Sequence, residues 1–297
     1  MTPASPAPPP LPQRMIALGP EGTYSDVAAR RLLEHLGAPQ VPLVYTRTIP
    51  EVLDRTEADP GAWGITPIEN SDIGVVVQAQ DSLVRHALTV VWEVNLRIHF
   101  SAVSRVPAEA VQTLYVHPVA HDQCSQFVAS RLPQAKVVFT ESNAASGLRF
   151  LEAAGSEAAG SETSVAPVAA IVPEELGMAH ARWLLQAGVQ NIANNTTRFL
   201  AVRHRAEPET FDYARRKTAL FIEPSEDRPG LLYRLLSIFN TYNLNLCRLE
   251  SRPDRIKPWN YFFFIDFNNA PGSAQCIADL QRIGHRITVL GSFDTVE

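Results

Sequence analysis

The sequence has few cysteines, no surplus of positive charge and no long apolar run. Its three cysteines among 297 residues lie far apart and fit no zinc-binding or disulfide spacing, which favours a reducing compartment such as the cytosol. The formal net charge of −5 lacks the basic footprint of a protein that binds nucleic acid. No apolar run approaches the roughly 18 residues that a membrane-spanning helix needs. We therefore expect a cytoplasmic protein that binds no metal, nucleic acid or membrane.

The chain is long enough for two domains, and its 45% of hydrophobic residues is ordinary for a globular protein. Residues 1–13 contain six prolines but neither a basic start nor a continuous apolar core, so they predict a disordered tail rather than a signal peptide. Residues 205–216 are charged and lack strong periodicity, which indicates a linker. These features predict a first domain at 14–204 and a second at 217–297.

Short apolar strands alternate with amphipathic helices along residues 14–204. This alternation predicts an α/β fold with a largely parallel sheet, in which ligands bind at the carboxyl ends of the strands. We expect the chain to cross twice between two lobes, with lobe 1 at 14–97 and 190–204 and lobe 2 at 98–189. Residues 217–297 follow the order βαββαβ, which is typical of a ferredoxin-like domain.

The stretch Asn194–Phe199 is the first candidate for a binding site. Its two asparagines favour a turn, and the apolar residues from Phe199 onwards predict a short buried strand. Thr197 and Arg198 lie in between, so a hydroxyl and a guanidinium stand at the entrance of a strand, a good place to hold a small anion. A turn whose threonine and arginine are merely solvated would show the same pattern.

Three further stretches place polar groups beside strand ends or helix starts. Gly19–Ser25 lies between a strand and a helix and offers free backbone N–H groups to an anion, although its glycines fit no dinucleotide or Walker pattern. Glu69–Ser71 follow a strand, and His117 precedes a helix. A plain connection, an exposed polar turn and a structural histidine are the alternatives at these places. Cys124 is expected to be a small buried residue rather than a nucleophile.

Several of these motifs, in this order, resemble those of prephenate dehydratases. The match covers the pattern Asn-x-Thr-Arg-Phe at 195–199, the glycine loop at 19–25 and the segment at 67–74. Residues 141–145 also match, except that Asn143 replaces the usual threonine. Both residue types cap helices well, so the helix start survives, but any substrate contact made by that threonine hydroxyl is in doubt here.

The second domain resembles the ACT regulatory domains of the same family. Asp227–Tyr233 and Glu250–Pro253 match effector motifs, and the segment Pro258–Phe263 matches as well. The resemblance covers roughly residues 14–295. It implies a monofunctional prephenate dehydratase with a C-terminal ACT domain. Its catalytic domain would have the two-lobed architecture of type II periplasmic binding proteins.

The implied reaction is the decarboxylating dehydration of prephenate to phenylpyruvate in L-phenylalanine biosynthesis, without a metal or other cofactor. Thr197 would donate a proton or hydrogen bond to the leaving hydroxyl, and Arg198 would clamp a substrate carboxylate. Glu69 would be either an acid with a raised pKa or a group that orients another. The other implied substrate-binding residues are Thr23, Asn70, Ser71, Ser142, Asn195 and Phe199. An arogenate dehydratase and a non-enzymatic, amino-acid-sensing binding protein are the alternatives.

Phenylalanine is the implied effector of the second domain, with tyrosine as the next candidate. Gly230 would let the effector carboxylate approach the start of a helix. The other implied effector-binding residues are Asp227, Leu231, Leu232, Glu250, Ser251 and Arg252. We also expect a homodimer or homotetramer. The four consecutive aromatic residues at 261–264 exceed what one packed face of a strand accommodates, and pairing of two domains would cover a sheet edge.

Overall fold

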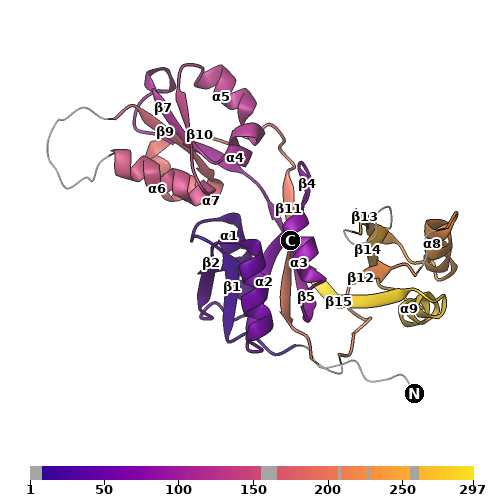
Figure 1. The fold of residues 1–297 in the computed structure, drawn as a ribbon. Coiled ribbons are helices and arrows are strands. Elements are labelled where there is room, and N and C mark those ends of the chain that lie inside the picture. The colour runs from indigo at the N-terminus through magenta and orange to yellow at the C-terminus, as the bar shows by residue number, and fades with distance from the viewer. Residues whose placement is uncertain (1–8, 155–165, 207–208, 226–227, 255–260) are drawn as a thin grey trace.

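The computed structural model describes residues 9–154, 166–206, 209–225, 228–254 and 261–297 (Figure 1). Three predictions fall wholly or partly outside these ranges: the tail at 1–8, the effector residue Asp227 and the matching segment at 258–260. Within the described ranges, no helix combines the length and the apolar character needed to cross a bilayer.

The first lobe is a mixed sheet combined with three helices. β1 pairs in parallel with both β2 and β3, while β11 lies antiparallel between β3 and β5. Thr23 and Thr48 cap α1 and α2, because each side-chain oxygen accepts a backbone N–H of the first helical turn. The elements are β1 (Arg14–Leu18), α1 (Tyr24–His35), β2 (Leu43–Thr46), α2 (Ile49–Ala58), β3 (Ala62–Asn70), β4 (Gly74–Val75), α3 (Val77–Leu83), β5 (Leu88–Arg97) and β11 (Thr196–His204).

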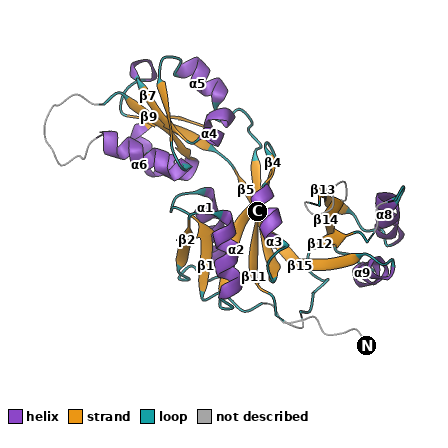
Figure 2. Ribbon diagram, viewed as in Figure 1, coloured by secondary structure: helices purple, strands orange, loops and turns teal. Residues whose placement is uncertain are grey.

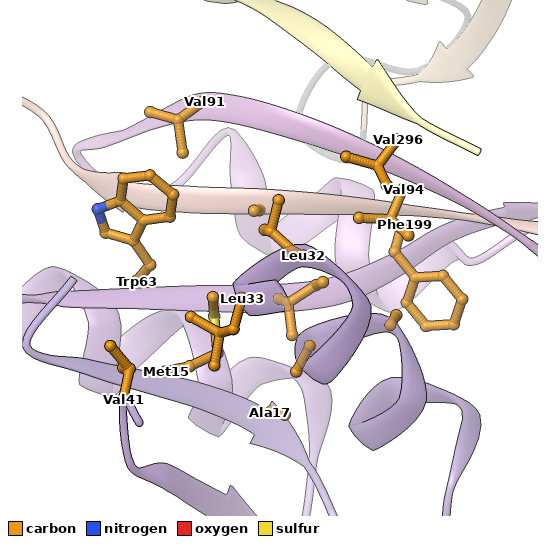
Figure 3. Packing of buried hydrophobic residues seen from close by; sticks show 14 of the residues in the cluster. Met15, Ala17, Leu32, Leu33, Val41, Trp63, Val91, Val94, Phe199 and Val296 are labelled. Carbon is orange, nitrogen blue, oxygen red and sulfur yellow. The ribbon is translucent and has the colours of Figure 1, made fainter. Parts of the chain in front are cut away.

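A hydrophobic cluster between α1 and this sheet forms the core of the first lobe. Leu32 and Leu33 of α1 belong to the same buried cluster as Met15 of β1 and Trp63 of β3 (Figure 3). Phe199 of β11 is also a member and is only 2% exposed. Burying such a side chain stabilises the fold by about 1.5–3 kcal/mol. The strand that begins at Thr196 is therefore anchored directly after its first three residues.

The second lobe is a five-stranded sheet in the order β10-β6-β9-β7-β8. β7 pairs in parallel with β8 and β9, whereas β6 runs antiparallel to β9 and β10. The chain enters this lobe after β5 and returns from it at β11, so two crossings link the lobes (Figure 1). The elements are β6 (Phe100–Ser104), β7 (Thr113–Val116), α4 (Pro118–Gln123), α5 (Ser125–Arg131), β8 (Lys136–Phe139), α6 (Asn143–Ala154), β9 (Val168–Pro173), α7 (Glu174–Ala179) and β10 (Leu184–Ala187), with short 3-10 turns at Ala108–Ala110 and Ala181–Trp183.

The C-terminal domain continues the sheet of the first lobe. Its strands lie in the order β13-β14-β12-β15, and β15 pairs in parallel with β5, so that a single ten-stranded sheet results. Helices α8 and α9 lie on the side of this domain that faces away from the first lobe (Figure 2). The elements are β12 (Lys217–Glu223), α8 (Leu231–Thr241), β13 (Leu246–Pro253), β14 (Tyr261–Asn268), α9 (Ser273–Arg282) and β15 (Arg286–Val296).

Both faces of the aromatic strand β14 are covered within a single chain. Phe263 and Phe267 pack in the cluster that includes the apolar residues of α8 and α9. Phe264 lies instead in a cluster with Leu200 of β11, so the first lobe covers the second face. Three of the four aromatic residues at 261–264 are therefore covered within one chain, whereas Tyr261 is 43% exposed, and the homo-oligomer stays a prediction. What the prediction overlooked is a long-range packing partner inside the same chain.

Candidate active site

A cavity of about 340 Å³ lies between the two lobes, beside the carboxyl ends of β1 and β3. This is the edge at which α/β sheets bind ligands, and the volume lies within the range of small-molecule sites. The polar lining includes Thr23, Ser25, Arg47, Asn70 and Thr197 from the first lobe and His117, Gln123, Glu141, Ser142 and Asn143 from the second. Both lobes thus contribute hydrogen-bonding groups to one cavity.

Thr197 presents its hydroxyl group to this cavity with a defined orientation. Oδ1 of Asn70 accepts the backbone N–H groups of Asp72 and Ile73, each at 3.0 Å. These two bonds fix the orientation of the amide, so Nδ2 of Asn70 donates to Oγ1 of Thr197 at 2.8 Å. Because Oγ1 is the acceptor in that bond, the proton of Thr197 remains available for donation to a ligand.

Asn195 and Ser71 hold the start of β11 against the end of β3. Asn195 is 1% exposed, and its Oδ1 accepts hydrogen bonds from Asn70 at 2.8 Å and from Ser71 at 3.3 Å. Oγ of Ser71 also accepts the backbone N–H of Thr196 at 2.9 Å. Neither Asn195 nor Ser71 lines the cavity. Both were predicted to bind substrate, and the geometry instead gives them a positioning role.

Arg198 and Glu69 lie on the opposite side of the sheet from the cavity. β11 and β3 pair so that Thr197 is opposite Asn70 and Arg198 is opposite Glu69. Successive residues of a strand face opposite sides, so a cavity-facing pair Thr197–Asn70 leaves the charged pair on the other face. Neither charged residue lines the cavity. The predicted carboxylate clamp at Arg198 and the predicted substrate contact at Glu69 are therefore incorrect.

Arg198 is held by carboxylates on that other face. Its Nη1 lies 2.6 Å from a carboxylate oxygen of Asp266 in the C-terminal domain, and its Nε donates to Glu93 of β5. Burial opposes the charged form of Arg198, but Asp266 and Glu93 outweigh it and raise the pKa of the guanidinium. Burial also opposes the charged form of Glu93 and by itself would raise the pKa of that carboxyl. The positive charges of Arg198 and Lys217 outweigh burial and hold the pKa of Glu93 below its usual range. Arg198 and Glu93 therefore both stay ionised near neutral pH.

Arg47 is the functional candidate that our sequence reasoning missed. Among the described residues that line the cavity, it is the only lysine or arginine. Burial lowers the pKa of His117, so that histidine is neutral at pH 7 and Arg47 supplies the positive charge. No motif includes Arg47, and the available signal was its position directly after β2, at the edge where α/β sheets bind ligands.

The other predicted substrate residues line the cavity. The hydroxyl of Thr23 donates within its own loop, to the carbonyl oxygens of Leu18 at 3.1 Å and Pro20 at 3.0 Å. Oγ of Ser142 accepts the backbone N–H of Ala145 at 3.0 Å, which leaves the serine proton for a ligand. Phe199 contributes an apolar wall while remaining part of the core.

Among the buried polar atoms that lack a partner in the described part of the chain, two belong to second-lobe residues at the cavity. They are Nδ1 of His117 and Oδ1 of Asn143, and both residues line the cavity. Buried polar atoms are nearly always hydrogen-bonded, so such atoms beside a cavity are ready to bind a ligand. Asn143, which replaces the usual threonine of the family motif, therefore lines the site with an amide group in place of a hydroxyl group.

The predicted effector residues of the C-terminal domain lie in two places, at the start of α8 and on β13. Gly230 caps α8 with a φ of 81°, and Leu231 is 8% exposed in the core beneath that helix. Leu232 packs at the margin of the same cluster. On β13, Ser251 is exposed, whereas Arg252 pairs with Asp81 of the first lobe at 3.4 Å.

Strand alternation again explains this separation, because Glu250 and Arg252 share one face of β13 and Ser251 lies on the other. Arg252 is consequently an interdomain contact in this structure. Only Ser251 and the start of α8 remain on the outward side.

Cys124 is a small buried residue, as predicted. Cys124 is fully buried, and burial raises the pKa of its thiol to about 12. Such a thiol is not a nucleophile at neutral pH. In the described ranges, no group of three histidine, cysteine, aspartate or glutamate residues is arranged to hold a metal ion.

Comparison with known proteins identifies the family. The family model for prephenate dehydratase matches residues 15–207, and the model for the ACT domain matches residues 225–285. The chain belongs to the prephenate dehydratase family. Both the predicted family and the predicted C-terminal ACT domain are thereby confirmed.

Relatives of the same family match nearly the whole chain. A bifunctional chorismate mutase/prephenate dehydratase from Stutzerimonas stutzeri is 30% identical, over 95% of this chain and 73% of that protein. A prephenate dehydratase from Methanocaldococcus jannaschii is 28% identical, over 92% of this chain and 95% of that protein. The crystal structure of a prephenate dehydratase from Arthrobacter aurescens in complex with L-Phe has a TM-score of 0.76 at 27% identity, and covers 95% of this chain and 89% of that one. The predicted α/β fold class is confirmed by this similarity.

Proposed function

We propose that the cavity between the lobes converts prephenate to phenylpyruvate, with Thr197 as the hydrogen-bond donor to the leaving hydroxyl. The observation that carries this proposal is the bond from Asn70 Nδ2 to Thr197 Oγ1, at 2.8 Å, which leaves the threonine proton for the substrate. The carboxylate on the ring leaves as carbon dioxide, and its bonding electrons enter the ring. The opposite C–O bond breaks, the ring becomes aromatic, and the oxygen departs as hydroxide, hydrogen-bonded to Thr197, and becomes water by taking a proton from solvent.

A threonine hydroxyl is a weak acid, so its contribution is a hydrogen bond that strengthens as negative charge develops on the departing oxygen. Positioned proton donors contribute about 10²–10⁴-fold to the rate. The hydrogen bonds of Asn70 to the backbone of Asp72 and Ile73 hold the donor in place before substrate arrives. A donor oriented in advance needs no reorganisation during the reaction.

Arg47 takes the role first assigned to Arg198. Prephenate is a dianion, and Arg47 is the only lysine or arginine among the described lining residues. A guanidinium pairs with a carboxylate through two parallel hydrogen bonds. Ser142 and His117 supply further polar contacts on the second-lobe side of the cavity. The first lobe would thus bind the charge of the substrate and the second lobe would supply hydrogen bonds, so prephenate would bind between the two lobes.

Arogenate is the second candidate substrate. It carries an ammonium group where prephenate carries a keto group, and Glu141 is a carboxylate in the cavity lining that suits an ammonium group. Incubating the purified protein with each compound separates the two. Prephenate gives phenylpyruvate, which absorbs strongly in alkali, whereas arogenate gives phenylalanine. We expect faster turnover of prephenate; a protein that turns over arogenate alone would reverse the assignment, and one that turns over neither would leave the binding-protein alternative.

We further propose that the ACT domain binds phenylalanine and thereby inhibits the enzyme, as a feedback inhibitor of its own pathway. The support is the family's ACT match at residues 225–285 and the L-Phe found in the Arthrobacter aurescens structure. Typical couplings of this kind change affinity by about 5- to 150-fold. The predicted cytoplasmic location and a homodimer or homotetramer belong to the same proposal.

A further inference from the structure

Six charged side chains meet between the first lobe and the ACT domain, on the face of β11 opposite the cavity. Three belong to the first lobe and three to the ACT domain, and positive and negative charges are equal in number. We call this set the interdomain charge cluster: Glu69, Glu93 and Arg198 from the first lobe, and Lys217, Arg248 and Asp266 from the ACT domain.

Each pair in this cluster that crosses between the domains is close. Arg198 lies 2.6 Å from Asp266, Glu93 lies 2.6 Å from Lys217, and Glu69 lies 3.3 Å from Arg248. Glu93 and Asp266 are the most deeply buried members, with side chains 0% and 4% exposed. Removing one partner from a buried ion pair leaves an uncompensated charge, which is costly. The cluster therefore constrains how β11 sits against the ACT domain.

The ladder between β11 and β3 is irregular at this point. Arg198 pairs with Glu69 and Phe199 pairs with Pro67, so Ile68 is an extra residue in β3, close to where Thr197 reaches the cavity. Such bulges interrupt the hydrogen-bonded ladder and re-aim neighbouring side chains. The direction of the Thr197 hydroxyl therefore depends on what holds Arg198, the next residue, together with the regular ladder that β11 forms there with β5.

We propose that Arg198 is a positioning residue for Thr197, and that Asp266 of the ACT domain holds Arg198 in place. The proposal rests on the proposed function, because it assumes that Thr197 is the hydrogen-bond donor. Arg198 does not touch the substrate. It sets the conformation of the start of β11, opposite the bulge in β3, and through Asp266 that conformation depends on the position of the ACT domain.

The test is steady-state kinetics of Asp266→Asn with prephenate, beside Glu223→Gln as the control. The first variant keeps the shape of the side chain and removes its charge. Glu223 also forms an ion pair in the ACT domain, with Arg286 at 3.2 Å, but away from the cluster. We expect kcat of Asp266→Asn to fall about 10- to 100-fold, since small misplacements of catalytic groups have effects of this size. KM should stay within about twofold, because no substrate contact is lost.

Glu223→Gln should leave both constants unchanged. Normal kcat in a folded Asp266→Asn variant overturns the proposal. If Asp266→Asn does not fold, as judged by circular dichroism, Glu93→Gln removes another carboxylate partner of Arg198 and tests its positioning role, with the same expected fall in kcat. Failure of the wild-type protein to turn over prephenate would instead remove the proposed function, so the two failures are distinct.

Arg198→Lys supplies the second measurement. It should lower kcat with little change in KM, whereas a higher KM at unchanged kcat would place Arg198 on the substrate and overturn the proposal. The double variant Arg198→Lys, Asp266→Asn should be no slower than the slower single variant, because both act through one contact. Multiplied losses in the double variant would show independent roles and contradict the inference.

Discussion

Thr197 and Arg198 are neighbours in sequence, yet their side chains serve opposite faces of β11. The hydroxyl of Thr197 accepts a hydrogen bond from Asn70 and faces the cavity. The guanidinium of Arg198 is paired with Glu93 and Asp266 behind the strand. At the scale of single residues, the motif therefore places the proposed hydrogen-bond donor directly before its proposed positioning residue.

Arg47→Gln tests the revised site of carboxylate binding. We expect KM for prephenate to rise about 10-fold or more while kcat changes little, because hydrogen bonds to charged groups contribute about 1.5–3 kcal/mol. Arg55→Gln is the matched control, since Arg55 pairs with Glu51 on the exposed side of α2 at 2.6 Å. An unchanged KM in Arg47→Gln would show that another group neutralises the substrate.

Thiol labelling tests the burial of the cysteines. Cys124 and Cys276 are fully buried, and burial raises the pKa of each thiol to about 12. Cys247 is exposed, although partial desolvation raises the pKa of its thiol as well. Because a reagent must reach the sulfur, a disulfide reagent at pH 8 should label Cys247 in the native protein and the other two only after unfolding. Rapid labelling of Cys124 in the native protein would contradict the described core.

At the scale of elements, the sequence supported the order of strands and helices better than the direction of side chains. The order βαββαβ predicted for residues 217–297 is observed as β12, α8, β13, β14, α9 and β15. The motif at Glu69–Ser71 was located correctly at the end of β3. Glu69 and Asn70, however, face opposite sides of the sheet. Strand alternation predicts that neighbouring residues do so, but it does not predict which side holds the cavity.

The missing information was long-range. Which face of β11 meets the cavity is decided by the strands and domains packed beside it, including the pairing of β15 with β5. No local pattern in the sequence reports that pairing. For the same reason the aromatic residues of β14 suggested a partner subunit, when the first lobe already covers Phe264. Tertiary packing therefore determines both which face of β11 meets the cavity and what covers Phe264.

The start of α8 gives a prediction at this scale. Gly230 has a φ of 81°, a left-handed conformation that residues with a Cβ atom adopt at a cost of about 1–2 kcal/mol. Gly230→Val should therefore lower the urea midpoint of the ACT domain, followed by circular dichroism. Gly230→Asn should be milder, because asparagine tolerates this conformation. Equal stability of wild type and Gly230→Val would contradict the described cap.

At the scale of the whole molecule, the outward side of the ACT domain remains uncovered. β13 is the last strand of the ten-stranded sheet, so its outer edge has no strand partner within the described chain. Three large apolar side chains are exposed nearby in this domain, namely Tyr233 at 76%, Leu249 at 41% and Tyr261 at 43%. Exposed strand edges and apolar patches favour association.

Light scattering tests this expectation. We expect a dimer or a tetramer, with a mass two or four times the 32.7 kDa of one chain, and dissociation on Leu249→Lys. Lysine on an exposed edge strand discourages pairing. A wild-type mass of one chain at micromolar concentration would rule out the proposed assembly.

The central claim concerns one hydroxyl group, and its most direct test is turnover of prephenate by wild type, Thr197→Val and Thr197→Ser. Valine keeps the size of threonine and replaces the hydroxyl by a methyl group. We predict that wild type forms phenylpyruvate, that Thr197→Val loses about 10²- to 10⁴-fold in kcat with an unchanged circular dichroism spectrum, and that Thr197→Ser retains part of the activity. A folded Thr197→Val variant with wild-type kcat would contradict the account.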